Sequence, residues 1–129
     1  MYRLLILLLL CALTSSCYEI RRDCSHFKTG NFEFTYTLDG KEKTGHFTRT
    51  LNYNIDYYEN TVDSATVRWI NDCEFILEKL NPQTKSEAKA IHMKILTTTD
   101  STYTFEYKFA VKDPNKPQKV YKGEAKKIE

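Results

Sequence analysis

GNFEFTYTLDGKEKTGHFT (residues 30–48) is the stretch that decides the fold class. In its first half, large apolar side chains occupy every second position, with Glu and Thr between them: Phe32, Phe34, Tyr36 and Leu38. A period of two is typical of a β-strand with one dry and one wet face. Asp39-Gly40 follows and favours a two-residue type I′ turn, because both turn positions need positive φ. We therefore expect residues 42–50 to return beside the first strand as a hairpin.

Similar strand patterns continue to the end of the chain. Residues 51–57 alternate again, and further strand-like runs cover about 61–70, 73–80, 93–99, 103–109 and 119–126. Thr84 stands three residues before Glu87, a capping box that predicts one short helix through about Ile91. The connections are short, which favours pairing of consecutive strands. We predict an all-β domain with one short helix: an antiparallel up-and-down meander of about eight strands, curled into a lipocalin-like barrel, a half-barrel or a clam.

The N-terminus has the pattern of an export signal. Arg3 precedes an apolar run over residues 4–13, which is too short for the roughly 20 residues that cross a bilayer. Residues 13–16 (LTSS) before Cys17 resemble a bacterial lipobox, which implies cleavage before Cys17 and a diacylglycerol on its thiol. A plain secretory signal that leaves Cys17 as an ordinary thiol is the alternative. We assign 1–16 as lipoprotein signal peptide, 17–23 as lipidated N-terminus and short tether, and 24–129 as a single β-domain.

The remaining cysteines are expected to pair with each other. Cys11 follows the bulky Leu10, so it is a poor site for signal cleavage. With Cys17 lipidated, Cys24 and Cys73 remain as an even pair in an oxidising compartment, which predicts a disulfide. Zinc binding is not expected, because two isolated cysteines lack the paired spacing and the nearby His of a zinc site.

Charge and motifs exclude several classes of function. The chain has 19 Lys and Arg against 17 Asp and Glu, and loss of Arg3 with the signal lowers the formal charge from +2 to +1. No Lys/Arg run exceeds two residues, so we expect no nucleic-acid partner. The histidines are scattered singly, and no nucleophile elbow, glycine-rich phosphate loop or HExxH motif occurs. We expect no enzyme: no catalytic residues, no metal and no cofactor.

The aromatic content allows two interpretations. Eight Tyr, seven Phe and Trp69 remain after residue 16, and many share the inward parity of their strands. A small curled sheet lined by such residues can enclose a cavity for an apolar ligand. Aromatic side chains also fill such interiors, since each buries about 150–250 Å². We favour the packed core and keep the ligand cavity as the alternative.

Four stretches carry a family resemblance: RDCSHFKTGNFEF (22–34), RWINDCEFIL (68–77) with the following LNP, KAIHMKILTTTD (89–100) and YTFEYKF (103–109). Together they resemble a family of short Bacteroidota lipoproteins without an established activity. The resemblance implies a lipoprotein and supplies no catalytic residues. Some family members carry the name DNA topoisomerase IV. We reject that activity for this chain, because it needs a DNA-cleaving tyrosine, an acidic metal site and hundreds of residues of clamp.

We therefore expect an envelope lipoprotein that is anchored to the membrane by its N-terminal lipid. Its β-domain is expected to act as a non-enzymatic binding or structural module with a protein or glycan partner. The alternative is a carrier of a small apolar ligand in a lipocalin-like cavity. Tyr18 follows Cys17 where Asp would signal inner-membrane retention in many Gram-negative bacteria, and we therefore expect the outer membrane.

Overall fold

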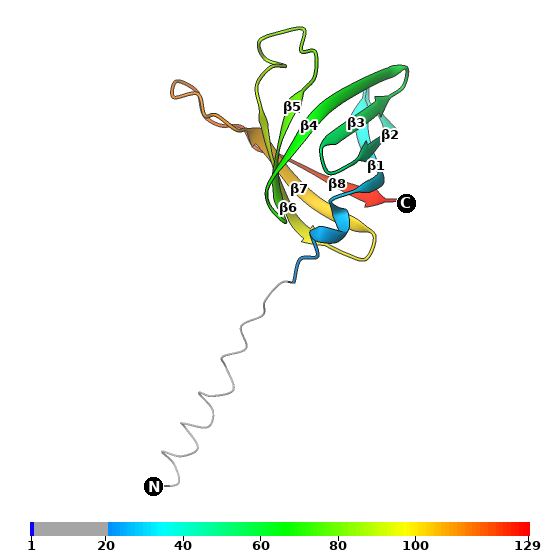
Figure 1. Ribbon diagram of the computed structural model, residues 1–129, viewed down its shortest axis with the longest axis vertical. Coiled ribbons are helices and arrows are strands. Elements are labelled where there is room, and N and C mark those ends of the chain that lie inside the picture. The colour runs from blue at the N-terminus through cyan, green and yellow to red at the C-terminus, as the bar shows by residue number, and fades with distance from the viewer. Residues whose placement is uncertain (2–20) are drawn as a thin grey trace.

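The computed structural model is a closed antiparallel barrel of eight strands (Figure 1). It describes Met1 and residues 21–129. Each strand is hydrogen-bonded to the next along the chain, and the last pairs with the first. The strands are β1 (Gly30–Leu38), β2 (Lys41–Arg49), β3 (Tyr53–Tyr58), β4 (Thr61–Asn71), β5 (Glu74–Lys79), β6 (Ile91–Thr98), β7 (Thr102–Phe109) and β8 (Tyr121–Lys127). The predicted up-and-down meander is confirmed, in its barrel form.

The hairpin that decides the fold class has the expected geometry. Asp39 and Gly40 both adopt positive φ, 52° and 73°, as a type I′ turn requires. The register places Phe32 opposite Phe47 and Phe34 opposite Gly45. The barrel closes through only two β1–β8 register pairs, Phe32 with Lys127 and Glu33 with Lys126. Residues 34–38 of β1 and 121–125 of β8 have no register partner across this seam.

The short helix predicted from Thr84 to about Ile91 is wrong. Thr84 Oγ1 accepts the Glu87 N–H at 3.1 Å, so half of the capping box forms. The Glu87 carboxylate instead accepts the Gln83 N–H at 2.7 Å, and the segment makes only turns before β6 begins at Ile91. Starting a helix fixes several residues for one hydrogen bond, and this connection is too short to recover that cost.

One end of the barrel is closed by its own core. A 3-10 helix, η1 (Ser25–Phe27), lies under the barrel close to the β6–β7 turn, and Phe27 is fully buried there (Figure 1). The core cluster at this end consists of Cys24, Phe27, Phe32, Phe47, Ile95, Tyr103 and Ala125. Connections 39–40, 59–60, 80–90 and 110–120 all lie at the opposite, open end. Because residues 21–129 contain all eight strands of the barrel and this core, we expect them to fold without the preceding segment.

The predicted disulfide between Cys24 and Cys73 is confirmed, with 5.1 Å between the two Cα atoms. Cys24 caps η1, and Cys73 lies in the turn before β5, so the bond fastens η1 to the closed end. Cys17 lies outside the described residues. Within residues 21–129, no helix has the length and apolar character needed to cross a membrane.

Candidate functional site

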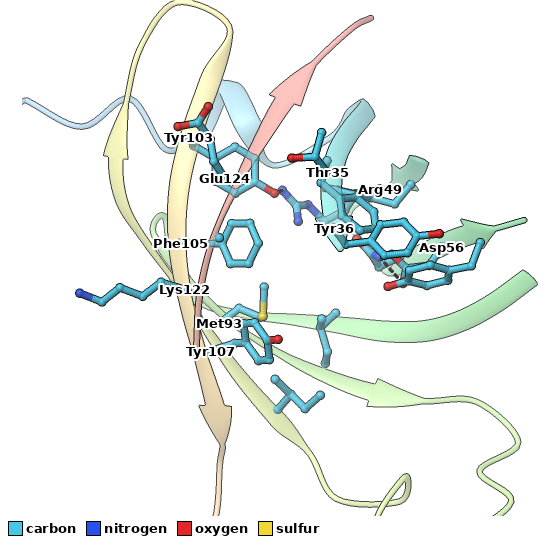
Figure 2. A pocket seen from close by; sticks show the side chains of 17 residues that line it. Thr35, Tyr36, Arg49, Asp56, Met93, Tyr103, Phe105, Tyr107, Lys122 and Glu124 are labelled. Carbon is cyan, nitrogen blue, oxygen red and sulfur yellow. Dashed lines mark hydrogen bonds between the residues drawn. The ribbon is translucent and has the colours of Figure 1, made fainter. Parts of the chain in front are cut away.

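A cavity of about 500 Å³ occupies the half of the barrel near its open end, between the closed-end core and the mouth (Figure 2). This volume is within the range of about 300–1,000 Å³ that small-molecule sites use. Side chains that line it include Phe34, Tyr36, Phe47, Arg49, Asn54, Asp56, Tyr58, Leu77, Ile91, Met93, Tyr103, Phe105 and Tyr107. Lys122 also borders the cavity, but its side chain points away from it (Figure 2). The lining is therefore aromatic and aliphatic, with a few polar groups.

Two glycines create much of this space. Gly45 lies opposite Phe34, and Gly123 lies opposite Phe105. A Cβ added to Gly45 would stand 2.5 Å from Phe34 Cζ, and one added to Gly123 would stand 2.7 Å from Phe105 Cζ. Both rings therefore lie flat against the neighbouring strand instead of projecting into the interior. The packed core that we favoured from the sequence is present at the closed end, whereas the open half contains a cavity.

Arg49 forms part of the cavity floor. Only 2% of its surface is exposed. Its Nη2 donates to Phe27 O at 2.7 Å and Tyr103 Oη at 3.1 Å, while Nε donates to Lys28 O at 3.2 Å. Five rings surround the guanidinium with centroids 4.8–5.8 Å from Cζ: Phe32, Phe47, Trp69, Phe75 and Tyr103. Arg49 thus joins the barrel wall to η1.

The guanidinium keeps two unused donors. Nη1 has no hydrogen-bond partner in the described part of the chain, and no carboxylate oxygen there forms an ion pair with Arg49. Figure 2 shows the guanidinium beside the Tyr103 hydroxyl, and Arg49 is among the residues that line the cavity. A buried cation without an anionic partner is costly, and the ring faces and carbonyls offset only part of that cost.

Strand β3 turns its polar face toward the barrel interior, although its alternation suggests that the apolar face lies inside. Tyr53 and Tyr57 are exposed, whereas Asn54 is 95% buried and Asp56 lines the cavity. The Asn54 side-chain amide donates to Asp56 Oδ2 at 3.0 Å. Asp56 stands directly opposite Asp63 on β4. The alternation correctly predicted a two-faced strand, but the polar face lies inside.

Burial controls the acidity of the groups around Asp56. Burial raises the pKa of Asp56 to about 6, with a further increase from Asp63 that Asn54 and Arg49 oppose. Burial, together with the charges of Asp56 and Asp63, also raises the pKa of Tyr58 to about 12. At neutral pH, therefore, Tyr58 is a neutral hydrogen-bonding group, and Asp56 is largely ionised.

Asp56 makes a pH-dependent contribution to stability. Its folded pKa of about 6 exceeds the ordinary 3.8, so the folded protein binds the proton more tightly than the unfolded chain. The free energy of unfolding should therefore fall as pH rises from about 4 to 6, by on the order of 2 kcal/mol. In Asp56→Asn this loss should disappear, and the variant should be the more stable protein at pH 7.5. Thermal unfolding between pH 4 and 8 measures both effects.

Asp100→Asn is the matched control, because Asp100 is exposed in the β6–β7 turn. It should keep the pH dependence of the wild type. If Asp56→Asn and Asp100→Asn show the same slope, Asp56 is not the group responsible.

The mouth has two chemically different sides. On one side, Lys79 Nζ lies 3.5 Å from Asp63 Oδ1 and 3.0 Å from Glu87 Oε1, which ties the β5–β6 connection to β4. On the other, a second hollow of about 530 Å³ shares Ile91 and Tyr107 with the cavity. Its lining contains one acidic residue, Asp113, and five lysines: Lys89, Lys108, Lys112, Lys116 and Lys119. The hollow next to the cavity is thus basic.

The sequence-predicted disulfide residues contribute to the floor, not to the cavity lining. Within the described residues, no group of three His, Cys, Asp or Glu is arranged to hold a metal ion. Fold and site together define an antiparallel β-barrel with an internal cavity, an aromatic wall and a buried cation on its floor. No protein-family model, curated protein or solved structure matches the chain.

Proposed function

We propose that this protein is an exported lipoprotein, anchored through Cys17, whose barrel carries a small ligand with an apolar body. The observation that supports this function best is the 500 Å³ cavity with its wall of Phe, Tyr and Met side chains. Of the two binding functions expected from the sequence, the carrier thereby takes precedence over the module for a protein or glycan partner. The function is binding and not catalysis, and it involves no nucleic acid.

The anchor and the mouth belong to opposite ends of the barrel. Cys24 lies at the closed end, and seven extended residue steps from Cys17 reach at most about 25 Å. An outer-membrane anchor would therefore hold the closed end near the bilayer. The mouth would then open away from the membrane, so that the ligand is exchanged with the aqueous side.

Cavity-filling substitution tests the carrier function. The neutral fluorescent probe N-phenyl-1-naphthylamine should bind the domain from residue 18 onward. In Gly123→Ala the new Cβ should push the Phe105 ring into the cavity, because the two would otherwise stand 2.7 Å apart. A ring that occupies part of the cavity removes space and contacts from the probe, and a loss of about 1.4 kcal/mol corresponds to roughly tenfold weaker binding. Fluorescence titration measures the affinity.

Lys126→Ala is the matched control, because Lys126 is exposed on β8 and does not line the cavity. It should bind the probe as the wild type does. A wild-type domain that binds neither this probe nor any co-purified ligand in native mass spectrometry would contradict the carrier function.

The anchor has a separate test. The parent protein should fractionate with membranes and carry the mass of a diacylglycerol and an acyl chain. Cys17→Ala should lose both, because the alanine offers no thiol for lipid attachment. Cys11→Ala should change neither. A Cys17→Ala protein that stays in the membrane fraction, or a parent protein without the added mass, would overturn the lipoprotein assignment.

One surface feature favours the second candidate, a module for a protein or glycan partner. Tyr53 and Tyr57 on β3 and Val62 on β4 are exposed on the outer face, with Tyr57 directly opposite Val62. Aromatic rings displayed in this way suit stacking on a sugar or packing against a protein. The probe titration separates the two functions, because a barrel that only presents its outer face has no reason to bind the probe inside.

A further inference from the structure

Resting on the proposed carrier function, we infer that the ligand is an amphipathic monoanion that binds head-down. Its anionic head lies on Arg49 Nη1 at the cavity floor, and its apolar body extends along the aromatic wall to the mouth. This assignment specifies the ligand class and its orientation, and it rests on the geometry of the floor, the wall and the entrance.

The floor presents an incomplete charge site. Three of the five N–H donors of Arg49 are used by Phe27 O, Lys28 O and Tyr103 Oη, which fixes the guanidinium in position. The two donors on Nη1 remain, on a side chain that is 98% buried and borders the cavity. A carboxylate or sulfonate oxygen is the partner that such a fixed, desolvated cation binds most strongly.

The wall above the floor suits an apolar body. Going from the floor toward the mouth, Phe34, Phe105, Met93 and Tyr107 line the cavity, and Figure 2 shows the last three close together on one side of it. Cations are absent from these wall positions, so a second charge on the ligand would have no partner there. The four wall side chains therefore suit the apolar body, and the charged head is placed at the Arg49 end.

The lysines at the entrance also favour a negatively charged ligand. Five lysines against one aspartate line the hollow that joins the mouth. A wall of one charge sign raises the local concentration of the oppositely charged ligand and accelerates its association. Once inside, the anion exchanges these exposed lysines for the buried guanidinium, where the low dielectric strengthens the interaction.

Asp56 opposes the anion and makes its binding pH-dependent. The charged and titratable groups that face Asp56 are Arg49 from β2, Asp63 from β4, Tyr58 on its own strand, and Tyr103 from β7. Ionised Asp56 competes for the field of Arg49 and repels a second negative charge, whereas protonated Asp56 does neither. Anion affinity should therefore fall as pH rises through about 6.

Three probes with the same ten-carbon body and permanent head charges test the assignment: decanesulfonate, decanol and decyltrimethylammonium. Each is titrated calorimetrically into the domain from residue 18 onward at pH 5.5 and pH 7.5. Hydrogen bonds to charged groups contribute about 1.5–3 kcal/mol, so decanesulfonate should bind at least about tenfold more tightly than decanol at pH 5.5. Decyltrimethylammonium should bind most weakly of the three.

Two variants locate the anionic head. Asp56→Asn should bind decanesulfonate about fivefold or more tightly than the wild type at pH 7.5 and lose the pH dependence. Lys112→Gln combined with Lys116→Gln removes two exposed lysines of the mouth and should slow association while preserving the tenfold preference for the sulfonate over decanol. Neither variant alters a residue that holds the floor together.

The outcomes separate the inference from the function on which it rests. If no probe binds, both fall. If decyltrimethylammonium binds most tightly, or if the three affinities agree within a factor of two, the cavity still carries a ligand but the anionic head is wrong. If the lysine variant abolishes the sulfonate preference, or Asp56→Asn retains the pH dependence, the head lies at the mouth and the assignment to Arg49 is overturned.

Discussion

Replacing Arg49 with methionine is expected to lower the free energy of unfolding by about 4 kcal/mol, because the substitution leaves buried acceptors without donors. Methionine is long and apolar, so it keeps much of the contact with the surrounding rings. It cannot donate to Phe27 O, Lys28 O or Tyr103 Oη, all three of which now receive hydrogen bonds from Arg49. The expected loss is therefore one of hydrogen bonding and cation–π contact, and η1 loses its connection to the barrel wall.

Thermal and urea unfolding measure this loss, and a drop of roughly 20 °C in Tm is expected for a domain of this size. Arg68→Met is the matched control, since Arg68 lies on the exposed face of β4. A surface change of this kind should stay within about 0.5 kcal/mol. Equal effects of the two substitutions would mean that the contacts of Arg49 with η1 contribute little to stability.

Prediction from the sequence succeeded for features that depend on neighbouring residues and on residue counts, and it was less definite for barrel closure. Strand β1 was predictable, because its apolar side chains repeat with a period of two and Asp39-Gly40 supplies the turn. The disulfide was predictable from an even count of cysteines. Closure of the barrel was left open among three shapes, because it depends on two register pairs between β1 and β8, strands that lie at opposite ends of the sequence.

The functional lining was harder to predict for a physical reason. Alternation shows that a strand has two faces, but the rule that the apolar face lies inside assumes a dry interior. In β3 the interior is a polar cavity wall, so Asn54 and Asp56 face inward while Tyr53 and Tyr57 face out. Asp56 was therefore missed as a site residue. Arg49 on β2 was missed as well. One signal for Arg49 was present, because it shares the parity of Phe47 on β2.

Predicting the volume of the cavity also requires the cross-strand register. Gly45 and Gly123 look like ordinary strand glycines in the sequence. Only their positions opposite Phe34 and Phe105 show that they let two rings lie flat and leave space in the barrel. Composition alone counts the same rings whether they fill an interior or line its wall, so it could not choose between the packed core and the cavity.

Removal of the disulfide is the second change with a large expected effect. Cys24 and Cys73 are 49 residues apart in sequence, and the chain-entropy model gives a stabilisation of about 4 kcal/mol for a loop of that length. Cys24→Ala combined with Cys73→Ala should therefore lower the midpoint of urea unfolding strongly. Reduction of the wild type with dithiothreitol should have a similar effect, since both treatments release the same cross-link. Agreement within about 1 kcal/mol between reduced and wild-type protein would contradict this contribution.

Local unfolding after loss of the disulfide should begin at η1, because the disulfide holds the start of this helix and Arg49 holds its end. Cys24 precedes η1, and the carbonyls of Phe27 and Lys28 accept from Arg49. Reduction removes one of these attachments, so trypsin should cleave after Lys28 much faster in the reduced domain under native conditions. Lys85, in the exposed β5–β6 connection, is the internal control and should be cleaved at the same rate in both forms. If reduction accelerates both cleavages equally, the bond stabilises the whole barrel and does not specifically hold its floor.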